Sequence, residues 1–445
     1  MSVTRLGGWD LHDTGLVQEP EKAIIVAVST PGRHDWTVED RLDELESLLR
    51  TAGARVEERV VQNRESPDPA YLIGRGKVDE VEELRKPLGA GLVVFDAELS
   101  PGQRRNLERH IGCKVIDRTQ VILDIFAQRA RTREGKLQVE LAQLTYSLTQ
   151  LVGSRELSRL GGGIGTRGPG ETKLEVDRRR IRQRIQGLKR EIESVRRHRA
   201  LSRREREKAP VAVAALAGYT NAGKSTLLNN LTGASVFVED KLFATLDPTT
   251  RRMRLPSGQE LLITDTVGFI RDLPHDLIAA FGATLEEITE ADVIVHVVDG
   301  SHPAAQKQIE TVERVLAGIG AGDVPVILAV NKIDLGVGVS LPGDRTRVMI
   351  SALSGLGFAD LLMAVDNELV GKRQVVTLVI PYSRQNLIAV MHEHGKVTSQ
   401  DYGQDAITVT GEVESVWAKR LLRWADPAAA KSEDGGETTG GPKGD

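Results

Sequence analysis

Cysteine and long apolar runs are scarce in this chain of 445 residues. It contains one cysteine, Cys113, which excludes an internal disulfide framework and a cysteine-cluster zinc site. No stretch of about 18 uninterrupted apolar residues occurs, so we expect no membrane span. The first fifteen residues also lack the apolar core of a secretion signal. These features predict a cytoplasmic protein.

Taken as an average, the net charge of −4 argues against a nucleic-acid partner, but the charge is unevenly distributed along the chain. Residues 128–208 contain 22 Lys and Arg against 10 Asp and Glu, a net charge of +12. The remaining 364 residues therefore carry −16. The chain has an acidic front, a basic middle and an acidic back.

The front of the chain alternates strand-like and helical patterns after a flexible N-terminus (1–20). A buried-strand pattern covers 23–28, a helical leucine spacing covers 39–51, and a further strand pattern covers 92–96. Such alternation is typical of a parallel sheet, so a small N-terminal α/β domain is expected over 21–118.

The basic middle, 119–208, predicts two helices with matching apolar stripes. One stripe contains Leu137, Leu141, Leu144, Leu148 and Leu151, and the other contains Leu174, Ile181, Ile185, Leu188, Ile192 and Val195. The segment 161–170 between them holds six glycines and cannot be helical. We expect an antiparallel hairpin with this glycine-rich tip, whose second arm (172–208) extends about 55 Å.

The back of the chain returns to strands and helices. Residues 209–371 predict a doubly wound, mostly parallel α/β domain, and 372–425 predict a small α/β C-terminal domain. The tail, 426–445, is rich in Gly, Glu, Ser and Pro and is expected to be disordered. The predicted fold class is therefore α/β, with a helical hairpin inserted between its domains.

A phosphate-binding loop follows the first strand of the larger α/β domain. Its sequence matches G-x-x-x-x-G-K-[ST] and consists of Gly218, Tyr219, Thr220, Asn221, Ala222, Gly223, Lys224 and Ser225. Glycines allow several backbone N–H groups to approach phosphate, and the following helix N-terminus favours its charge. Lys224 is expected on the β- and γ-phosphates, and the Ser225 hydroxyl on Mg²⁺.

A second motif indicates which base the nucleotide carries. Asn331, Lys332, Ile333 and Asp334 form N-K-x-D after an apolar strand. A carboxylate at Asp334 can accept hydrogen bonds from guanine N1–H and the N2 amino group, a donor pair that adenine lacks. The alternative is an ordinary turn at a strand end. After a strand, Ser351, Ala352 and Leu353 offer backbone N–H groups to guanine O6, although this short motif is weak alone.

The segment between these motifs supplies the candidate γ-phosphate sensors. Asp265, Thr266, Val267 and Gly268 form D-x-x-G, in which Asp265 can hold Mg²⁺ through water and the Gly268 N–H can contact the γ-phosphate. The preceding loop contains Phe243, Ala244, Thr245, Leu246 and Asp247, and its threonine can complete the Mg²⁺ shell when that phosphate is present. Thr249 and Thr250 are rivals that spacing alone does not exclude.

These motifs together resemble the HflX-type ribosome-associated GTPases of the Obg–HflX group. The resemblance covers roughly residues 20–425 and rests on GYTNAGKS, LFATLDPTT, DTVGF, NKID and the stretch GGGIGTRGPGETKLEVDRRRI. It implies that Thr245 is the switch threonine and that Lys224, Thr245, Asp265 and Gly268 take part in hydrolysis. It also implies binding to the large ribosomal subunit and its rRNA, and dissociation of stalled or idle ribosomes, by a protein that is monomeric when free.

One residue departs from the pattern of many GTPases. The position after D-x-x-G, where a glutamine often orients water, is Phe269, whose ring can neither donate nor accept a proton. We therefore expect slow intrinsic hydrolysis and a partner that completes the site, as stimulating partners do elsewhere by factors of about 10³–10⁵.

The basic hairpin favours an RNA partner without the family argument. Its second arm carries 15 basic against 6 acidic residues, and an ordinary solvated helix face would balance them. The candidate RNA contacts are Arg167, at the tip, with Arg178, Arg179 and Arg180. Two other classes of function stay open: a P-loop ATP-dependent enzyme, which N-K-x-D disfavours, and a helical scaffold whose nucleotide domain only binds.

Overall fold

The computed structural model describes most of the chain: residues 20–32, 36–152, 173–206, 211–233, 242–272, 282–336, 346–370, 373–393 and 395–425. Two compact units are present. One is formed by the chain up to Ile125 with 150–166, and the other by 126–149 with everything from Arg167 onward. The glycine-rich tip 161–170, the N-terminus 1–19 and the tail 426–445 lie outside the described residues.

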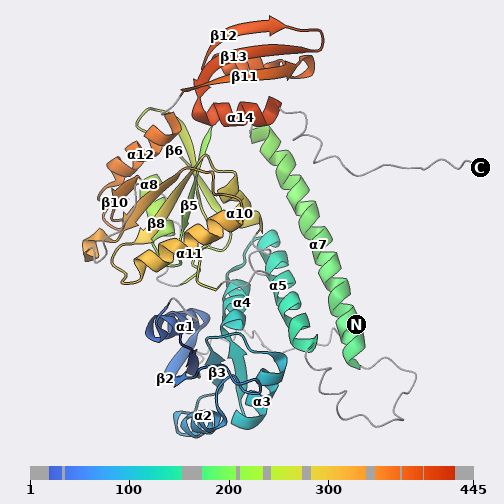
Figure 1. Cartoon of the computed structure of the whole chain (residues 1–445), viewed down its shortest axis with the longest axis vertical. Helices are drawn as coiled ribbons and strands as arrows, with labels where there is room; N and C mark the ends of the chain where they lie inside the picture. Colours follow the sequence, from blue (N-terminus) through green and yellow to red (C-terminus); the bar gives the residue numbers. More distant parts are fainter. Residues whose placement is uncertain are drawn as a thin grey trace, which may run out of the picture. The chain divides into compact units, whose positions relative to one another are not determined.

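The first unit contains the expected parallel sheet (Figure 1). Its strand order is β2-β1-β3-β4, and all neighbouring strands run parallel. The apolar run at 23–28 forms the central strand and is buried, because helices cover both faces of such a sheet. The elements are β1 (Glu21–Ser29), α1 (Val38–Ala52), β2 (Ala54–Asn63), α2 (Arg75–Leu88), β3 (Leu92–Phe95), α3 (Pro101–Ile111) and β4 (Lys114–Asp117), followed by α4 (Arg118–Arg129), which continues into the second unit.

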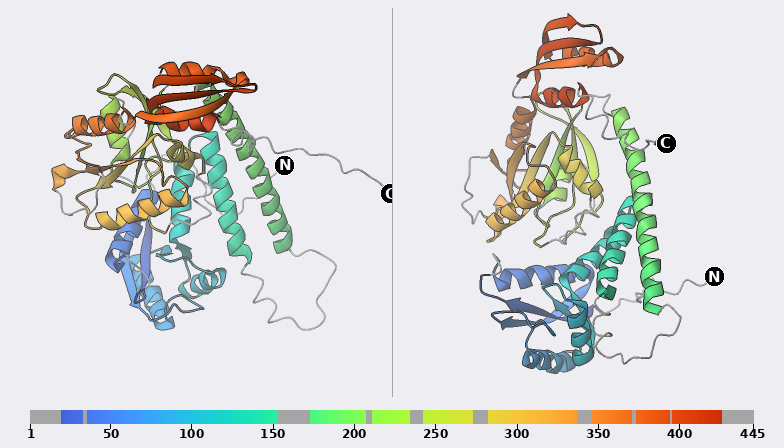
Figure 2. Two further views of the ribbon diagram at one scale, coloured as in Figure 1. Left: turned by 45° about the horizontal axis from the view of Figure 1, so that its top comes forward. Right: turned by 45° about the vertical axis from the view of Figure 1, so that its right-hand side comes forward.

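The helical hairpin consists of α5 (Arg133–Val152) and α7 (Lys173–Arg206), as expected. Leu137 on α5 packs in one cluster with Leu188 and Ile192 on α7. Glu140 on α5 accepts hydrogen bonds from the guanidinium of Arg184 at 2.7 and 2.8 Å. Both views of Figure 2 show the two helices side by side and antiparallel. The apolar stripes therefore form the contact between the two arms.

The larger sheet of the second unit has the order β10-β9-β8-β5-β7-β6 and is parallel except for β6. The central strands β5, β8 and β9 are apolar and buried. Because these strands run parallel, the loops that follow them meet at one edge of the sheet. Strand β6 was not predicted from the sequence. The elements are β5 (Ala212–Gly218), α8 (Lys224–Thr232), β6 (Thr249–Arg254), β7 (Glu260–Asp265), α10 (Gly282–Thr289), β8 (Val293–Asp299), α11 (Ala305–Gly318), β9 (Val326–Asn331), η1 (Ile333–Leu335), β10 (Arg347–Met349) and α12 (Phe358–Val370).

The C-terminal region is a three-stranded antiparallel sheet of order β11-β13-β12. Met391, Trp417 and Leu421 lie in its buried core, which joins the sheet to its helices. One strand, β12, was missed by the sequence analysis. The elements are β11 (Arg373–Pro381), η2 (Tyr382–Arg384), α13 (Asn386–Glu393), β12 (Gly395–Tyr402), β13 (Ala406–Glu414) and α14 (Ser415–Ala425). Among the helices of the described residues, none has the length and apolar character needed to cross a membrane.

Candidate nucleotide site

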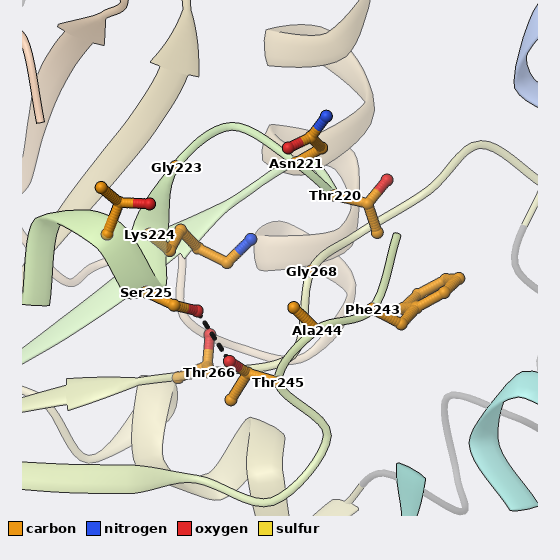
Figure 3. A pocket seen from close by; sticks show the side chains of 11 residues that line it. Thr220, Asn221, Gly223, Lys224, Ser225, Phe243, Ala244, Thr245, Thr266 and Gly268 are labelled. Atoms are coloured by element: carbon orange, nitrogen blue, oxygen red, sulfur yellow. Dashed lines mark hydrogen bonds between the residues drawn. The ribbon is translucent and has the colours of Figure 1, made fainter. Parts of the chain in front are cut away.

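The phosphate-binding loop connects β5 to α8 and lines a pocket at the edge of the larger sheet (Figure 3). Its glycines are required by close approaches. A Cβ on Gly218, whose φ is +153°, would lie 2.2 Å from the carbonyl oxygen of Val297. A Cβ on Gly223, at φ +98°, would lie 2.2 Å from the Asn331 side-chain nitrogen. Only glycine fits these positions, which bring the loop against β8 and the N-K-x-D segment.

Lys224 begins α8 and points into this pocket. Its ammonium donates hydrogen bonds to the backbone carbonyls of Gly218 (3.1 Å) and Tyr219 (2.9 Å). The side chain is buried, and burial lowers the pKa of Lys224 to about 8, with the nearby Asp265 opposing the shift. A buried cation held by neutral carbonyls is suited to an incoming phosphate, which would supply the missing negative charge.

Three oxygen-bearing side chains gather beside Lys224. The Ser225 and Thr245 hydroxyls lie 2.7 Å apart, and they donate to Asp265 Oδ2 at 2.6 and 2.7 Å, respectively. Figure 3 shows the Ser225–Thr245 contact. Burial raises the pKa of Asp265, with Lys224 and the two hydroxyls opposing the shift. The three residues come from α8, the loop before β6 and the end of β7.

The same contacts distinguish Thr245 from its two rivals. Thr249 and Thr250 lie on β6, where they pair with Asp265 and Thr264 of β7. The Thr250 hydroxyl lies 2.9 Å from the Thr264 hydroxyl. Both rivals are therefore part of the sheet, whereas Thr245 alone of the three has its hydroxyl on Ser225 and Asp265.

The oxygen cluster has the chemistry that magnesium requires. Mg²⁺ prefers oxygen ligands and usually combines one or two protein groups with water and phosphate. Asp265 Oδ1 is buried and has no hydrogen-bond partner among the described residues. A buried carboxylate oxygen without a donor fits a cation or its water shell. A cluster of three or more His, Cys, Asp or Glu side chains was not found in the described ranges, so no all-protein metal cage is present there.

The D-x-x-G segment lies against the phosphate loop. A Cβ on Gly268 would lie 2.9 Å from Thr220 Cα and 3.0 Å from Lys224 Nζ, which leaves room for the backbone alone. The Thr266 hydroxyl donates to the Leu216 carbonyl at 2.7 Å, and Val267 is buried. Thr266 and Gly268 line the pocket with Thr220, Asn221, Gly223, Lys224, Ser225, Thr226, Phe243, Ala244 and Thr245.

Phe269 lies in the core and not over the pocket. Its N–H donates to the Gly218 carbonyl at 3.0 Å, and its carbonyl accepts from the Thr220 N–H at 2.7 Å. The side chain is fully buried. Backbone contacts therefore hold it to the phosphate loop, and its side chain supplies no group that could orient water.

The N-K-x-D segment organises the base side of the site through Asn331. Its amide donates to the Ala222 carbonyl and accepts from the Ala352 N–H, both at 2.7 Å. The Lys332 ammonium lies 2.7 Å from Asp299, a contact that lowers the pKa of Asp299 against the effect of its burial. Asp334 is exposed on η1, where its carboxylate is accessible to a base.

The Ser351–Leu353 segment is only partly arranged as expected. Ser351 is buried, and its hydroxyl accepts from the Ser354 N–H at 3.2 Å. The Ala352 N–H is already used by Asn331, so contact with guanine O6 would require that hydrogen bond to be exchanged. Leu353 is exposed. A role for this segment in base recognition stays a prediction.

Two residues of the switch loop do not face the pocket. The Asp247 carboxylate accepts hydrogen bonds from the Arg131 and Thr132 N–H groups, both at 2.9 Å. Leu246 is buried. The ring of Phe243 points away from Lys224 in Figure 3, although Phe243 borders the pocket. The expectation that all five loop residues contact nucleotide is therefore too broad for the conformation seen.

The four candidate RNA contacts on the hairpin differ in whether the structure exposes them. Arg167 lies outside the described residues. Arg178 is only 6% exposed, so it does not present its guanidinium on the surface. Arg179 and Arg180 are exposed on the other side of α7. The sequence analysis treated the three arginines alike. Consecutive residues of a helix point to different faces, however, so one arginine of the three can be buried while its neighbours are exposed.

One residue of the site, Asp299, and one contact of the phosphate-loop residue Tyr219 were not predicted from the sequence. Asp299 ends β8 and pairs with Lys332, and its place after an apolar parallel strand was the available signal. The Tyr219 hydroxyl accepts from the Arg271 N–H at 2.8 Å, which joins the phosphate loop to the segment after D-x-x-G. No short motif announces that second contact.

This site occupies the carboxyl edge of a doubly wound sheet, where open α/β folds bind their ligands. Its lysine and hydroxyls line one pocket, Asp265 accepts hydrogen bonds from those hydroxyls, and Asp334 lies on η1 directly after β9. The fold and the site together are those of a P-loop GTPase.

Comparisons with known proteins give the family. Residues 39–127, 129–206 and 213–332 match the models "GTP-binding GTPase N-terminal", "GTP-binding GTPase Middle Region" and "50S ribosome-binding GTPase". The chain is 48% identical over 420 residues to GTPase HflX of Caldanaerobacter subterraneus subsp. tengcongensis, covering 94% of this chain and 97% of that relative. It is 47% identical over 380 residues to GTPase HflX of Escherichia coli, covering 84% and 87%. The chain belongs to the HflX family of GTPases.

Among solved structures, the chain matches a GTP-binding protein of Sulfolobus solfataricus in complex with GDP. It is 22% identical, with a TM-score of 0.42, and the match covers 78% of this chain and 98% of that chain.

Proposed function

We propose that this GTPase binds GTP with Mg²⁺ in the pocket of the larger sheet, acts on the large ribosomal subunit and dissociates stalled or idle ribosomes in the cytoplasm. It would be monomeric when free. The observation that carries the nucleotide part is the cluster of Ser225, Thr245 and Asp265 oxygens beside the buried Lys224. Ser225 and Thr245 would hold Mg²⁺ directly, and Asp265 would hold it through water.

The residues of this site divide the work of hydrolysis. Lys224 would neutralise charge on the β- and γ-phosphates. The Gly268 N–H and the Thr245 hydroxyl would contact groups that exist only in the GTP state, which makes them the γ-phosphate sensors. Asp334 would accept the two guanine donors. Among the described residues that line the pocket, none is a carboxylate, a histidine or a glutamine that could orient the attacking water.

That gap supports a role for a partner in catalysis. Phe269 is buried and held through its backbone, so rearranging its side chain would not fill the gap. A stimulating partner raises turnover by about 10³-fold or more in other GTPases. The match of residues 213–332 to the model of 50S ribosome-binding GTPases supports the large ribosomal subunit as that partner.

The exposed arginines of α7 support contact with rRNA. Arg180, Arg182 and Arg190 are exposed on the long arm, and they belong to a segment with uncompensated positive charge. Lys and Arg side chains bind phosphate with release of counterions, so the affinity would fall steeply with salt. In a plot of the logarithm of affinity against the logarithm of salt concentration, the slope should become shallower by about 0.7–0.9 for each phosphate contact removed.

A direct test measures phosphate release from GTP with and without purified large subunits. We expect slow turnover alone and a rise of about 10³-fold with subunits. Turnover that subunits do not change would contradict the proposed partner. Deleting 161–170 should leave GTP binding intact and abolish ribosome dissociation. The molar mass of the free protein, measured by light scattering, tests whether it is monomeric.

The charge reversals Arg182→Glu with Arg190→Glu test the RNA surface against a matched control. They should weaken subunit binding and reduce the salt slope by about 2, and leave nucleotide affinity unchanged. The control pair Arg314→Glu with Lys396→Glu changes the net charge equally at exposed positions on α11 and β12. Equal losses from both pairs would indicate a nonspecific charge effect and refute a contact by α7.

A further inference from the structure

The switch loop is attached to the start of the hairpin through one carboxylate. Asp247 Oδ2 accepts hydrogen bonds from the Arg131 and Thr132 N–H groups, both at 2.9 Å. The Thr132 hydroxyl donates to Asp247 Oδ1 and itself accepts from the Gly135 N–H at 3.0 Å. The carboxylate therefore satisfies donors in the turn between α4 and α5 that the first turn of a helix leaves free.

The fit around this carboxylate is close. A Cβ on Gly135 would lie 2.5 Å from Asp247 Oδ1 and 3.1 Å from the Thr132 hydroxyl. Gly135 is in the first turn of α5, at an ordinary helical position that by itself does not need glycine. Its lack of a side chain is what admits the aspartate.

A second contact holds the same loop on the other side of Thr245. The rings of Phe243 and Phe126 meet edge to face, with centroids 4.6 Å apart, and both are buried. Phe126 lies in the last turns of α4. Phe243 adopts φ +54°, which is uncommon for an aromatic residue and persists only where the surroundings impose it. Thr245 thus lies two residues from each of two contacts with the α4–α5 junction (126–135).

We propose that Asp247 is a positioning residue for GTP hydrolysis. It anchors the switch loop to the α4–α5 junction and so holds the Thr245 hydroxyl beside Ser225 and Asp265. The proposal rests on the role of Thr245 as γ-phosphate sensor proposed above. Asp247 touches neither Ser225 nor Asp265 in the contacts of the site, so it acts through Thr245.

Coupling through this contact works in both directions. If the junction favours the loop conformation that binds GTP, then GTP must favour the ordered junction to the same extent. The junction continues directly into α5, whose apolar face packs on α7. Nucleotide state is thereby transmitted to the base of the hairpin without a change in the hairpin's own packing.

The first experiment compares affinities for a non-hydrolysable GTP analogue and for GDP. Asp247→Asn and Thr132→Val should each weaken the analogue about ten-fold, because each removes hydrogen bonds to a charged group. GDP affinity should change by less than about two-fold. The double variant should be no worse than either single variant, since both act on one contact. Thr132→Ser keeps the hydroxyl and should restore the original ratio.

Two control variants remove contacts of the same kind elsewhere. The Asp366 carboxylate accepts from the Ser257 N–H (2.8 Å) and hydroxyl (2.7 Å) in the same domain, so Asp366→Asn is matched to Asp247→Asn. Thr149→Val is matched to Thr132→Val. Thr149 lies on α5, and its hydroxyl donates a hydrogen bond to the Tyr146 carbonyl. Neither control should alter the ratio of analogue to GDP affinity.

Parallel losses for analogue and GDP would show a purely structural role and overturn the proposal, as would an unchanged ratio in Asp247→Asn. Thr245→Ala separates this failure from failure of the proposed function. If Thr245→Ala changes the ratio but Asp247→Asn does not, only the anchoring role is wrong. If Thr245→Ala leaves the ratio unchanged, the sensor role itself is refuted.

Hydrogen exchange supplies a readout independent of affinity. The amides of Arg131, Thr132 and Gly135 should exchange more slowly with the GTP analogue than with GDP, and Asp247→Asn should remove this difference. Equal exchange in both nucleotide states of the unaltered protein would overturn the coupling.

Discussion

Asp96 and Asp265 both stand at the carboxyl ends of buried parallel strands, one in the N-terminal sheet and one in the GTPase sheet. Asp96 accepts hydrogen bonds from the guanidinium of Arg41 at 2.6 and 2.7 Å, and both side chains are buried. Arg41 also donates to the Val28 carbonyl at 3.2 Å. Asp117, at the end of β4, accepts from the Leu99 and Gln120 N–H groups. The two carboxylates at this edge are satisfied by groups of the chain itself.

The edge of the GTPase sheet is built differently. In the described part of the chain, Asp265 keeps one buried oxygen without a donor, and the buried Thr220 hydroxyl also has no hydrogen-bond partner. Within the described part of the chain, the Lys224 ammonium donates hydrogen bonds to two backbone carbonyls and to no side chain. Burying polar groups in this way costs free energy unless a ligand completes them.

The comparison shows that topology alone does not define the function of a sheet edge. Two parallel sheets with similar strands and helices place carboxylates at equivalent ends. Among the described residues, Asp96 and Asp117 are paired within the chain, whereas Asp265 keeps one oxygen without a donor. Incomplete hydrogen bonding, and not the presence of charge, therefore distinguishes the ligand site from the structural one. Substitutions that exchange charge for neutrality should separate the two edges.

The largest effect is expected at the base. Asp334→Asn should lower GTP affinity and favour xanthosine nucleotides, whose C2 oxygen accepts from an amide, with a change in base selectivity of about 10³–10⁴-fold. Competition between GTP and xanthosine triphosphate measures it. Stability should change by less than about 0.5 kcal/mol, because the side chain is exposed.

Asp323→Asn is the matched control for this prediction. Asp323 is an exposed aspartate in the same domain, before β9, and its amide should leave base selectivity as it was. An unchanged preference for GTP in Asp334→Asn would refute the assignment of this carboxylate to guanine.

The next effect separates two buried cations, Arg41 and Lys224. Arg41→Met leaves Asp96 buried without its partner and should destabilise the N-terminal sheet by about 3–5 kcal/mol. Lys224→Met removes a charge that burial disfavours, so the nucleotide-free GTPase sheet should be as stable as before or more stable, by about 1–2 kcal/mol. The same variant should lose at least about 10²-fold in GTP affinity.

Hydrogen exchange resolved to β1 and β5 measures each sheet separately, because a chain with several domains need not unfold in one transition. Destabilisation of the GTPase sheet by Lys224→Met as large as that of the N-terminal sheet by Arg41→Met would show that the two edges do not differ as argued.

The sequence predicted the parts of this molecule that repeat a period or follow a phosphate-binding motif. The run at 23–28 and the stripes beginning at Leu137 and Leu174 are long patterns imposed by burial, and they correctly predicted a central strand and a hairpin. The motif beginning at Gly218 predicted the loop that lines the pocket, because the chemistry of that motif depends on adjacent residues. The base contacts of the motif beginning at Asn331 stay a prediction.

Short, polar and long-range features could not be predicted in the same way. Strand β6 reads TTRRMR and β12 reads GKVTSQDY, and both have mostly exposed side chains with little apolar alternation to mark them. The pairs Asp247–Thr132 and Asp299–Lys332 join residues far apart in the chain, and each partner alone looks like a surface residue. Their contacts arise only when the sheet is assembled.

The smallest predicted effect concerns pH and again depends on the incomplete edge. Because the pKa of Lys224 is about 8, the charged fraction in the free protein falls from about nine-tenths at pH 7 to about one-quarter at pH 8.5. Phosphate binds the charged form, so GTP affinity should fall about four-fold over this range at constant ionic strength. Titration with a non-hydrolysable GTP analogue measures this change in affinity. The pH is kept at or below 8.5 so that the guanine base stays neutral. In Lys224→Arg the side chain stays charged and the profile should be flat.

Stability of the nucleotide-free protein should respond to pH in the opposite sense. Between about pH 8 and the ordinary lysine value of 10.5, the unfolded chain binds more protons at this residue than the folded one. Stability therefore rises with pH across that window, whereas the cost of the buried charge is fully present below pH 8. Exchange protection of β5 that falls between pH 8 and 9.5, after correction for intrinsic exchange, would contradict this sign. Since GTP holds Lys224 in its charged form, bound nucleotide should abolish the rise, and the incomplete edge would then behave like the paired one.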